Sequence, residues 1–173
     1  FLLSDYNVTI CASSDTSIND AKKEFQLWDD SVLFVKADIS KEGDVIKLID
    51  HSLKRFNQID VLINNAGIHT PIGPFQNIDS KEWLSTILID LIGPFYTIKH
   101  SVNHMIKRKF GRIINISGGG ATKPMPFYSA YSAAKAGLIR FTETIAEELS
   151  MNNITVNAIA PGFINTSIHE SSI

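Results

Sequence analysis

The sequence predicts an α/β fold in which a parallel sheet is covered by helices on both faces. Short runs rich in β-branched residues alternate with longer segments of helical period, which is the pattern of consecutive β-α-β units. The chain has 173 residues, of which 44% are hydrophobic and 20% are charged. These values are ordinary for a globular chain, so we expect residues 1–173 to form one domain.

Five short apolar runs are expected to form strands, at residues 8–12, 32–36, 61–64, 112–117 and 154–159. Between the second and third runs, apolar residues recur at helical spacing opposite charged ones, at Val45, Leu48, Ile49, Leu53 and Phe56. Asp79 and Glu82 have capping-box spacing, so a helix should begin near Ser80, and Pro94 should kink it. Small residues followed by larger apolar ones predict a closely packed helix over 129–149.

Composition and charge argue against several classes of partner. The formal net charge is -2 and the two signs are interspersed, which leaves no basic surface for nucleic acid or for an anionic membrane. No run reaches the roughly 18 apolar residues of a membrane span, because segment 84–98 is broken by Asp90, Gly93 and Pro94. Cys11 is the only cysteine, so an internal disulfide is impossible and a reduced, cytoplasmic setting is favoured. We expect no metal site.

Tyr131 and Lys135 are four residues apart, so on a helix they lie one turn apart on the same face. A free tyrosine has a pKa of about 10, and a nearby ammonium lowers it by favouring the phenolate. Such a tyrosine can exchange a proton with a hydroxyl or carbonyl oxygen near neutral pH. Taken alone, the same spacing also fits an exposed helical pair with no chemical role.

Three motifs in a fixed order give this pair its context. Asn64-Asn65-Ala66-Gly67 follows a strand, Tyr131-Ser132-Ala133-Ala134-Lys135 opens a helix, and 157–166 comes after the last strand. Together they closely resemble the classical short-chain dehydrogenase/reductase family over essentially the whole chain. The resemblance implies a Rossmann-like, doubly wound parallel sheet and an NAD(P)-dependent oxidoreductase. Such an enzyme interconverts a small-molecule carbonyl and a secondary alcohol by hydride transfer.

The resemblance also implies roles for individual residues. Tyr131 would be the general acid/base, while Lys135 would lower its pKa and hold the nicotinamide ribose. The implied cofactor-binding residues are Asn64, Asn65, Ala66, Gly67, Tyr131, Lys135, Pro161, Gly162 and Thr166. For the two glycines the alternative is simply a turn that requires a positive φ.

Asp38 and Ile39 follow the second strand and match the family's acidic and apolar pair that meets the adenine ring. The alternative is a helix N-cap through Asp38 or Ser40. The end of the first strand should distinguish the two dinucleotides, because a carboxylate there binds the ribose 2′-hydroxyl of NAD. The chain has Ser13 and Ser14 at this point and no carboxylate before Asp15. NADP is therefore slightly favoured over NAD, although no arginine supports it.

Two of the family's catalytic positions differ here. The expected serine, 13 residues before Tyr131, is Gly118. Ser117 is adjacent, but neighbouring side chains on a strand point to opposite faces, so it replaces the hydroxyl only if the strand end bulges or the glycine run shifts its register. The position of the family's asparagine is Asp90, which can accept a hydrogen bond from a relay water but cannot donate one. Burial beside Lys135 would alter both pKa values.

The chain is expected to be part of a longer protein. The family's glycine-rich phosphate loop and first central strand have no counterpart before residue 8, and the chain stops near residue 173, inside the segment that forms the family's substrate lid and before its last strand. The interpretation is a partial NAD(P)-binding Rossmann domain with a gap in its sheet, from a protein that forms homodimers or homotetramers when full length. A catalytically weak or silent dinucleotide-binding sensor or scaffold is the main alternative, because of Gly118 and Asp90. A purely structural assembly module has little support.

Overall fold

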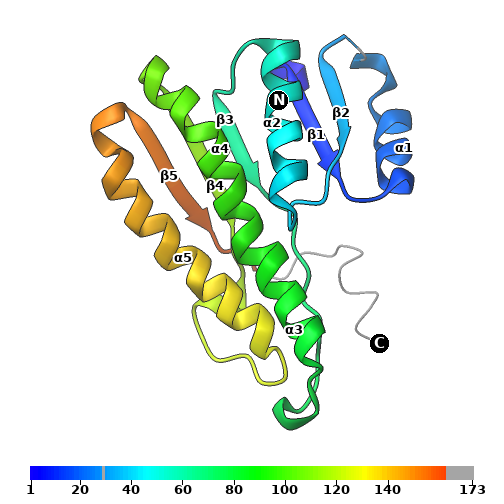
Figure 1. Cartoon of the computed structure of the whole chain (residues 1–173), viewed down its shortest axis with the longest axis vertical. Helices are drawn as coiled ribbons and strands as arrows, with labels where there is room; N and C mark the ends of the chain where they lie inside the picture. Colours follow the sequence, from blue (N-terminus) through cyan, green and yellow to red (C-terminus); the bar gives the residue numbers. More distant parts are fainter. Residues whose placement is uncertain (29, 163–173) are drawn as a thin grey trace.

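The computed structural model describes residues 1–28 and 30–162, and its five strands run in the same direction (Figure 1). The strands are β1 (Val8–Ala12), β2 (Val32–Lys36), β3 (Val61–Asn64), β4 (Gly111–Ile116) and β5 (Ile154–Ile159). Four of the predicted strands are confirmed to the residue, and the fourth strand in the chain begins and ends one residue earlier than predicted. The α/β fold class is therefore confirmed.

The strands form two parallel sheets, β1–β2 and β3–β4–β5. Val8 is opposite Val32 at the start of the first sheet. In the second sheet Val61 is opposite Arg112, and Gly111 is opposite Ile154. No hydrogen-bonded ladder joins β1 to β3 among the described residues. This is the gap that the sequence analysis expected between these two strands.

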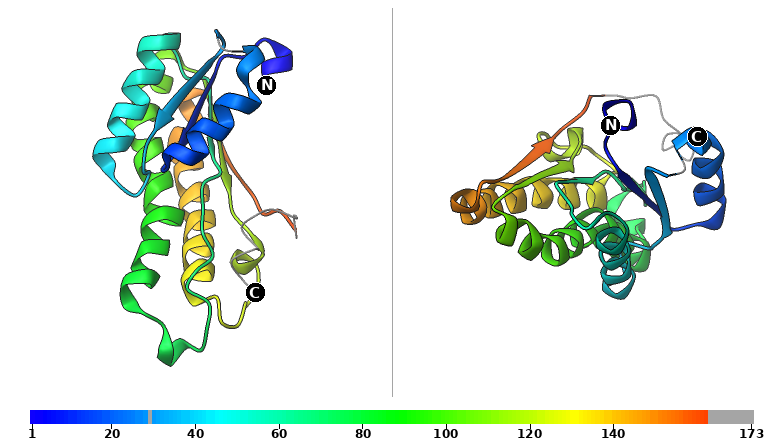
Figure 2. Two further views of the ribbon diagram at one scale, coloured as in Figure 1. Left: turned by 90° about the vertical axis from the view of Figure 1, so that its right-hand side faces the viewer. Right: turned by 90° about the horizontal axis from the view of Figure 1, so that it is seen from above.

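Helices cover both sides of the strands. The longer ones are α1 (Asp15–Glu24), α2 (Glu42–Phe56), α3 (Ser80–Ile87), α4 (Gly93–Arg108) and α5 (Ser129–Leu149). Figure 2 shows α2, α4 and α5 side by side on one face, with α1 beside β2 on the other. Single helical turns lie outside these helices, at η1 (Leu2–Ser4), η2 (Gln26–Trp28), η3 (Phe75–Asn77), η5 (Gly119–Ala121) and η6 (Ser150–Asn152). This arrangement is the Rossmann-like, doubly wound one that the motifs implied.

Asp79 begins α3 as predicted, since its carboxylate accepts hydrogen bonds from the N–H groups of Lys81 and Glu82. Pro94 was expected to kink the helix that begins near Ser80. At this point a π-helical turn, η4 (Leu88–Ile92), joins α3 to α4, and the N–H of Gly93 donates to the carbonyl of Leu88 five residues back. The physical reason is that Pro94 has no N–H for the Asp90 carbonyl, so one wider turn replaces the normal α-helical bond.

The main apolar core lies between the second sheet and helices α4 and α5. It is formed by Ile98, Met105, Ile113, Ile154 and Val156. Position 111, the first residue of β4, is a glycine with no room for a side chain, because a Cβ there would lie 2.5 Å from the Met105 sulfur. A smaller core of Val35, Ala37 and Leu48 lies between β2 and α2. Within the residues described, no helix has the length and apolar character needed to cross a bilayer.

Candidate active site

The strand direction brings the two catalytic candidates of α5 to the carboxyl ends of β3 and β4. Tyr131 and Lys135 lie on the same face of α5, as the sequence predicted, with the Lys135 Nζ 5.8 Å from the centre of the Tyr131 ring. Lys135 is only 4% exposed. A buried ammonium needs hydrogen-bond acceptors or an opposite charge, and the structure provides both.

The Lys135 ammonium has two described partners. It donates to the backbone carbonyl of Ile116 at 3.0 Å, and its Nζ is 3.3 Å from Oδ2 of Asp90. Asp90 lies on the π turn, fully buried, and its Oδ1 accepts a hydrogen bond from the N–H of Ile68 at 2.8 Å. Strand β4, the loop after β3 and the π turn therefore meet at one buried ion pair.

Gly67, in the loop after β3, lies directly against both charged groups of this ion pair. A Cβ at Gly67 would lie 3.1 Å from the Lys135 Nζ and 3.3 Å from Oδ2 of Asp90. Neither Gly67 nor Gly162 has a positive φ, a conformation that Gly73 alone adopts among the described glycines. The alternative of a turn requiring positive φ is therefore wrong for both glycines. For Gly67 the requirement is close approach.

Gly118 has a similarly close neighbour. A Cβ at Gly118 would lie 1.9 Å from the Tyr131 hydroxyl oxygen, although the Gly118 backbone is extended and suits any residue. The adjacent Ser117 is buried, and its hydroxyl donates to the backbone carbonyl of Lys135 at 3.1 Å. Ser117 thus ties the end of β4 to α5. Its predicted role as the replacement hydroxyl stays a prediction.

The charges around Tyr131 correct one expectation from the sequence. Lys135 was expected to lower the tyrosine pKa, but the pKa of Tyr131 is raised above its ordinary value. Burial is the main cause, because it disfavours the phenolate, and the Asp90 carboxylate adds to the effect. Burial also raises the pKa of Asp90, against the opposing attraction of Lys135 and the Ile68 hydrogen bond.

Asn64, predicted to bind the cofactor, points its amide into the core. Its Nδ2 donates to Asn115 at 2.8 Å, while its Oδ1 accepts from the Thr97 hydroxyl at 2.6 Å. Asn115 in turn donates to the Thr142 hydroxyl at 2.8 Å, which donates to the carbonyl of Leu138. This chain of hydrogen bonds joins α4, β3, β4 and α5. Only the backbone of Asn64 therefore remains for a ligand, whereas the next two residues of the motif, at 65 and 66, are exposed.

The two adenine candidates contact the protein itself. Asp38 accepts from both the N–H and the hydroxyl of Ser40, at 3.1 and 2.6 Å, and pairs with Lys41 at 3.1 Å. These contacts, with the Ser40 hydroxyl first, hold the pKa of Asp38 below its ordinary value. The N-cap of α2 is Lys41, so the alternative of an N-cap through Asp38 or Ser40 is wrong. Ile39 packs on α4, where a Cβ at Gly93 would lie 2.7 Å from its Cδ1.

The remaining cofactor candidates follow β5. Pro161 is half-buried and Gly162 is exposed, and, apart from its chain neighbours, no other described residue has an atom within 4 Å of a Cβ placed on Gly162. Thr166 lies outside the described residues. The structure thus brings together Gly67, Asp90, Gly118, Tyr131 and Lys135, but gives no described contact between this group and Asp38 or the turn at 161–162.

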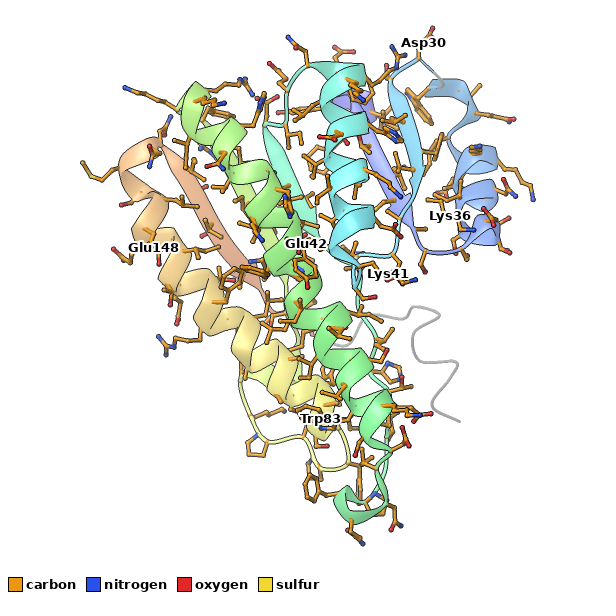
Figure 3. All side chains as sticks on the ribbon, in the orientation of Figure 1. Asp30, Lys36, Lys41, Glu42, Trp83 and Glu148 are labelled. Atoms are coloured by element: carbon orange, nitrogen blue, oxygen red, sulfur yellow. The ribbon has the colours of Figure 1, made fainter. Side chains whose placement is uncertain are left out.

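Sequence reasoning missed the backbone part of the site. The N–H of Ile68 and the carbonyl of Ile116 hold Asp90 and Lys135, and no residue type signals such contacts. It also missed the hydrogen bond from the Trp83 indole to the Ser129 hydroxyl, at 3.2 Å, which links α3 to the start of α5. Figure 3 shows Trp83 beside that end of α5. The signal for the π turn was present, since Pro94 follows Asp90 by four residues.

A Rossmann-like, doubly wound sheet is the fold of a large class of dinucleotide-binding proteins. The short chain dehydrogenase family model matches residues 1–173, and the chain belongs to this family. A 3-oxoacyl-[acyl-carrier-protein] reductase of Synechocystis sp. is 39% identical over 160 residues, which are 92% of this chain and 64% of the relative. A D-beta-hydroxybutyrate dehydrogenase of Rhizobium meliloti is 34% identical over 143 residues, 83% of this chain and 55% of the relative.

Solved structures of the same fold include both dinucleotides. ElxO with NADP bound has a TM-score of 0.91 and 28% identity, covering 100% of this chain and 72% of ElxO. NAD+-bound xylitol dehydrogenase has a TM-score of 0.86 and 29% identity, covering 91% of this chain and 61% of that one. The chain spans between 55% and 64% of the length of the curated relatives it matches.

Proposed function

We propose that the protein containing this chain is an NAD(P)(H)-dependent oxidoreductase that interconverts a small-molecule carbonyl and a secondary alcohol. The observation that carries the proposal is the pair of Tyr131 and Lys135 on one face of α5, with the Lys135 Nζ 5.8 Å from the tyrosine ring. A phenol that can give or take a proton and a cation beside it are the groups that this reaction needs.

The residues present fit a nicotinamide cofactor. An ammonium has three N–H donors, and the one hydrogen bond described for the Lys135 ammonium goes to the Ile116 carbonyl, so donors remain for a ribose hydroxyl. When bound, the nicotinamide would supply or accept the hydride at its C4 atom.

The chain's own residues would handle the proton. In carbonyl reduction Tyr131 donates its hydroxyl proton to the substrate oxygen, and in alcohol oxidation the phenolate takes that proton back. Lys135 orients the ribose, and the lysine ammonium is itself held in position by the Ile116 carbonyl and the Asp90 carboxylate. Because the pKa of Tyr131 is raised, the tyrosine is protonated at neutral pH, which is the form required for reduction.

NADP is the cofactor we favour over NAD. Ser14 caps α1 by accepting from the N–H of Ser17 at 3.1 Å, and Ser13 beside it is exposed. Lys36 lies opposite Ala12 in the β1–β2 register, so a cation flanks the strand end that would meet the ribose. A cation at this point accommodates a 2′-phosphate.

The protein would also be a homo-oligomer in the cytoplasm. Three large apolar side chains are exposed on α3, η4 and α4, namely Leu84, Leu88 and Phe95. Such side chains on neighbouring elements favour contact with another chain. The cytoplasmic proposal rests on Cys11, the single cysteine of the sequence. Light scattering of the purified protein measures the assembly.

The experiment is turnover by a Tyr131→Phe variant, with Tyr128→Phe as the matched control, since Tyr128 precedes the same helix and is also half-buried. The substrates to begin with are a 3-oxoacyl thioester and 3-hydroxybutyrate, because the relatives' names describe compounds of these types. We expect Tyr131→Phe to lose about 100- to 10,000-fold in kcat/KM, the usual contribution of general acid–base catalysis. Full turnover by this variant would refute the assignment.

A dinucleotide-binding sensor or scaffold is the second candidate. Gly118 supports it, because one missing oxyanion donor typically costs about 100- to 1,000-fold in rate. Nicotinamide fluorescence titration combined with a carbonyl-substrate screen separates the two proposals. The sensor binds NADPH without turnover, whereas the oxidoreductase shows both.

A further inference from the structure

The buried ion pair between Asp90 and Lys135 leaves little positive charge for Tyr131. Asp90 is fully buried and Lys135 is 4% exposed, with 3.3 Å between Oδ2 and Nζ. Water therefore screens neither charge, and the negative charge of Asp90 offsets most of the electric field of the Lys135 ammonium. The Lys135 ammonium is also bonded to the Ile116 carbonyl, on the β4 side. Two contacts thus draw the ammonium toward β4 and the π turn.

Asp90 is held in place from a second direction. Its Oδ1 accepts from the N–H of Ile68, so the carboxylate cannot turn away from the site without losing that bond. Gly67 covers the pair, because an added Cβ would be 3.1 Å from Nζ and 3.3 Å from Oδ2. The carboxylate is therefore a fixed part of the wall around Tyr131.

The other ionisable side chains of the surrounding elements are few. The loop after β3 contributes His69, whose ring centre is 6.1 Å from that of Tyr128 before α5. Helix α3 contributes Lys81 and Glu82, both exposed, and the segment after β4 contributes the exposed Lys123 beyond its three glycines. Of the charged groups, Asp90 is the one that raises the pKa of Tyr131.

We propose that Asp90 is a positioning residue that holds Lys135 by ion pairing and offsets its positive charge. As a result, alcohol oxidation is fast only at alkaline pH, while carbonyl reduction stays fast at neutral pH. This inference rests on the proposed function and deepens it. It assigns a role to the carboxylate that stands where the family has an asparagine.

The chemistry follows from the proton balance. In reduction, a hydride from the reduced nicotinamide adds to the carbonyl carbon, the C=O π bond opens, and the substrate oxygen takes the Tyr131 proton. The tyrosine then regains a proton from solvent, and the nicotinamide is left oxidised. Oxidation reverses each step and needs the phenolate form of Tyr131. Lys135 stabilises this phenolate poorly, because the Asp90 carboxylate offsets the lysine's positive charge. The equilibrium between the two substrates is unchanged, since Asp90 alters only the pH at which each direction is fast.

The test is the pH titration of Tyr131 in the Asp90→Asn variant, read from the ultraviolet absorbance of phenolate. Subtracting the titration of the matching Tyr131→Phe protein isolates Tyr131 from the other three tyrosines. We expect the Tyr131 midpoint to fall by about one unit or more when the carboxylate charge is removed. The acid limb of the pH–rate profile for alcohol oxidation should move to lower pH by the same amount. At neutral pH this makes oxidation about tenfold faster.

Asp50→Asn is the charge-matched control, because Asp50 is an exposed carboxylate on α2. It should leave the Tyr131 midpoint unchanged. Asp90→Ser carries the same expectation as Asp90→Asn and places no N–H against the ammonium, so it serves if the asparagine variant does not fold. An unchanged midpoint in the Asp90 variants overturns the inference. A shifted midpoint without any turnover supports the effect of the Asp90 charge on Tyr131, but refutes the proposed oxidoreductase and with it the effect on alcohol oxidation.

Discussion

The hydroxyl of Tyr131 fills the space that a side chain on Gly118 would need, since a Cβ at Gly118 would lie 1.9 Å from that oxygen. The Gly118 backbone is extended, so the contact, and not strain, excludes a larger residue. Any residue other than glycine would have to turn the tyrosine ring. The missing serine hydroxyl and the tyrosine position are thus one structural feature.

Gly118→Ser and Gly118→Ala form a matched pair that tests this feature. Both place a Cβ against Tyr131 and displace it alike, but only serine adds a hydroxyl that can donate to the substrate oxygen. We expect the serine variant to exceed the alanine variant in kcat/KM by about 100- to 1,000-fold, the usual value of one oxyanion donor. Equal rates in the two variants would mean that a hydroxyl at 118 contributes nothing here.

The chain of buried hydrogen bonds across the second sheet predicts a stability effect. Thr142→Val keeps the side-chain shape but leaves the Nδ2 of Asn115 without its acceptor. An unsatisfied buried donor costs about 1–3 kcal/mol in the free energy of unfolding, which urea titration measures. Thr144→Val is the control, because the Thr144 hydroxyl makes the same kind of bond to a carbonyl four residues back on the exposed side of α5. The control should change stability by less than about 0.5 kcal/mol.

Most of the fold could be predicted because its signals are local. Strands such as β3 are short β-branched runs, and the Asp79 cap marks the start of α3. The Tyr131–Lys135 face follows from helical spacing alone. The sequence also suggested that Asp90 could be buried beside Lys135, and the structure shows this as an ion pair with 3.3 Å between Oδ2 and Nζ.

The parts that could not be predicted depend on tertiary packing. The direction of the Tyr131 pKa depends on how deeply the hydroxyl is buried and on which charge lies nearer, and helical spacing determines neither. The inward orientation of Asn64 depends on Asn115 and Thr97, which are far from it in sequence. Ile39 meets Gly93 for the same reason. Motif matching assigned these side chains to a ligand, whereas packing uses them within the protein.

Asp38 predicts a dependence of stability on pH. Its folded pKa is lower than the ordinary value of 3.8, so its ionised form stabilises the fold. That contribution is fully present above the ordinary value and is lost as the pH falls through the folded pKa. Asp38→Asn should therefore unfold more easily than wild type at neutral pH, and the difference should disappear in acid. Urea unfolding at both pH values measures it. A difference that persists unchanged in acid would point to lost hydrogen bonds with Ser40 and not to charge.

Lys36 predicts the cofactor preference. Figure 3 shows it at the end of β2 on the side of α1, and its Nζ is 2.5 Å from Oδ2 of Asp15. We expect Lys36→Met to lower the ratio of kcat/KM for NADPH to that for NADH by about tenfold, which is the loss of roughly 1.4 kcal/mol of phosphate attraction. Asp15→Asn should raise the same ratio, because it removes a carboxylate that competes for the ammonium and repels a 2′-phosphate.

The control for Lys36 is Lys47→Met, which removes an exposed ammonium from α2 that is 4.0 Å from Asp44. This variant loses the same net charge as Lys36→Met, so a general change in the field of the protein would affect both alike. The ratio should stay at the wild-type value in Lys47→Met. If all three variants keep the wild-type ratio, Lys36 does not meet the ribose. The preference for NADP would then rest on Ser13 alone, because the Ser14 hydroxyl already caps α1.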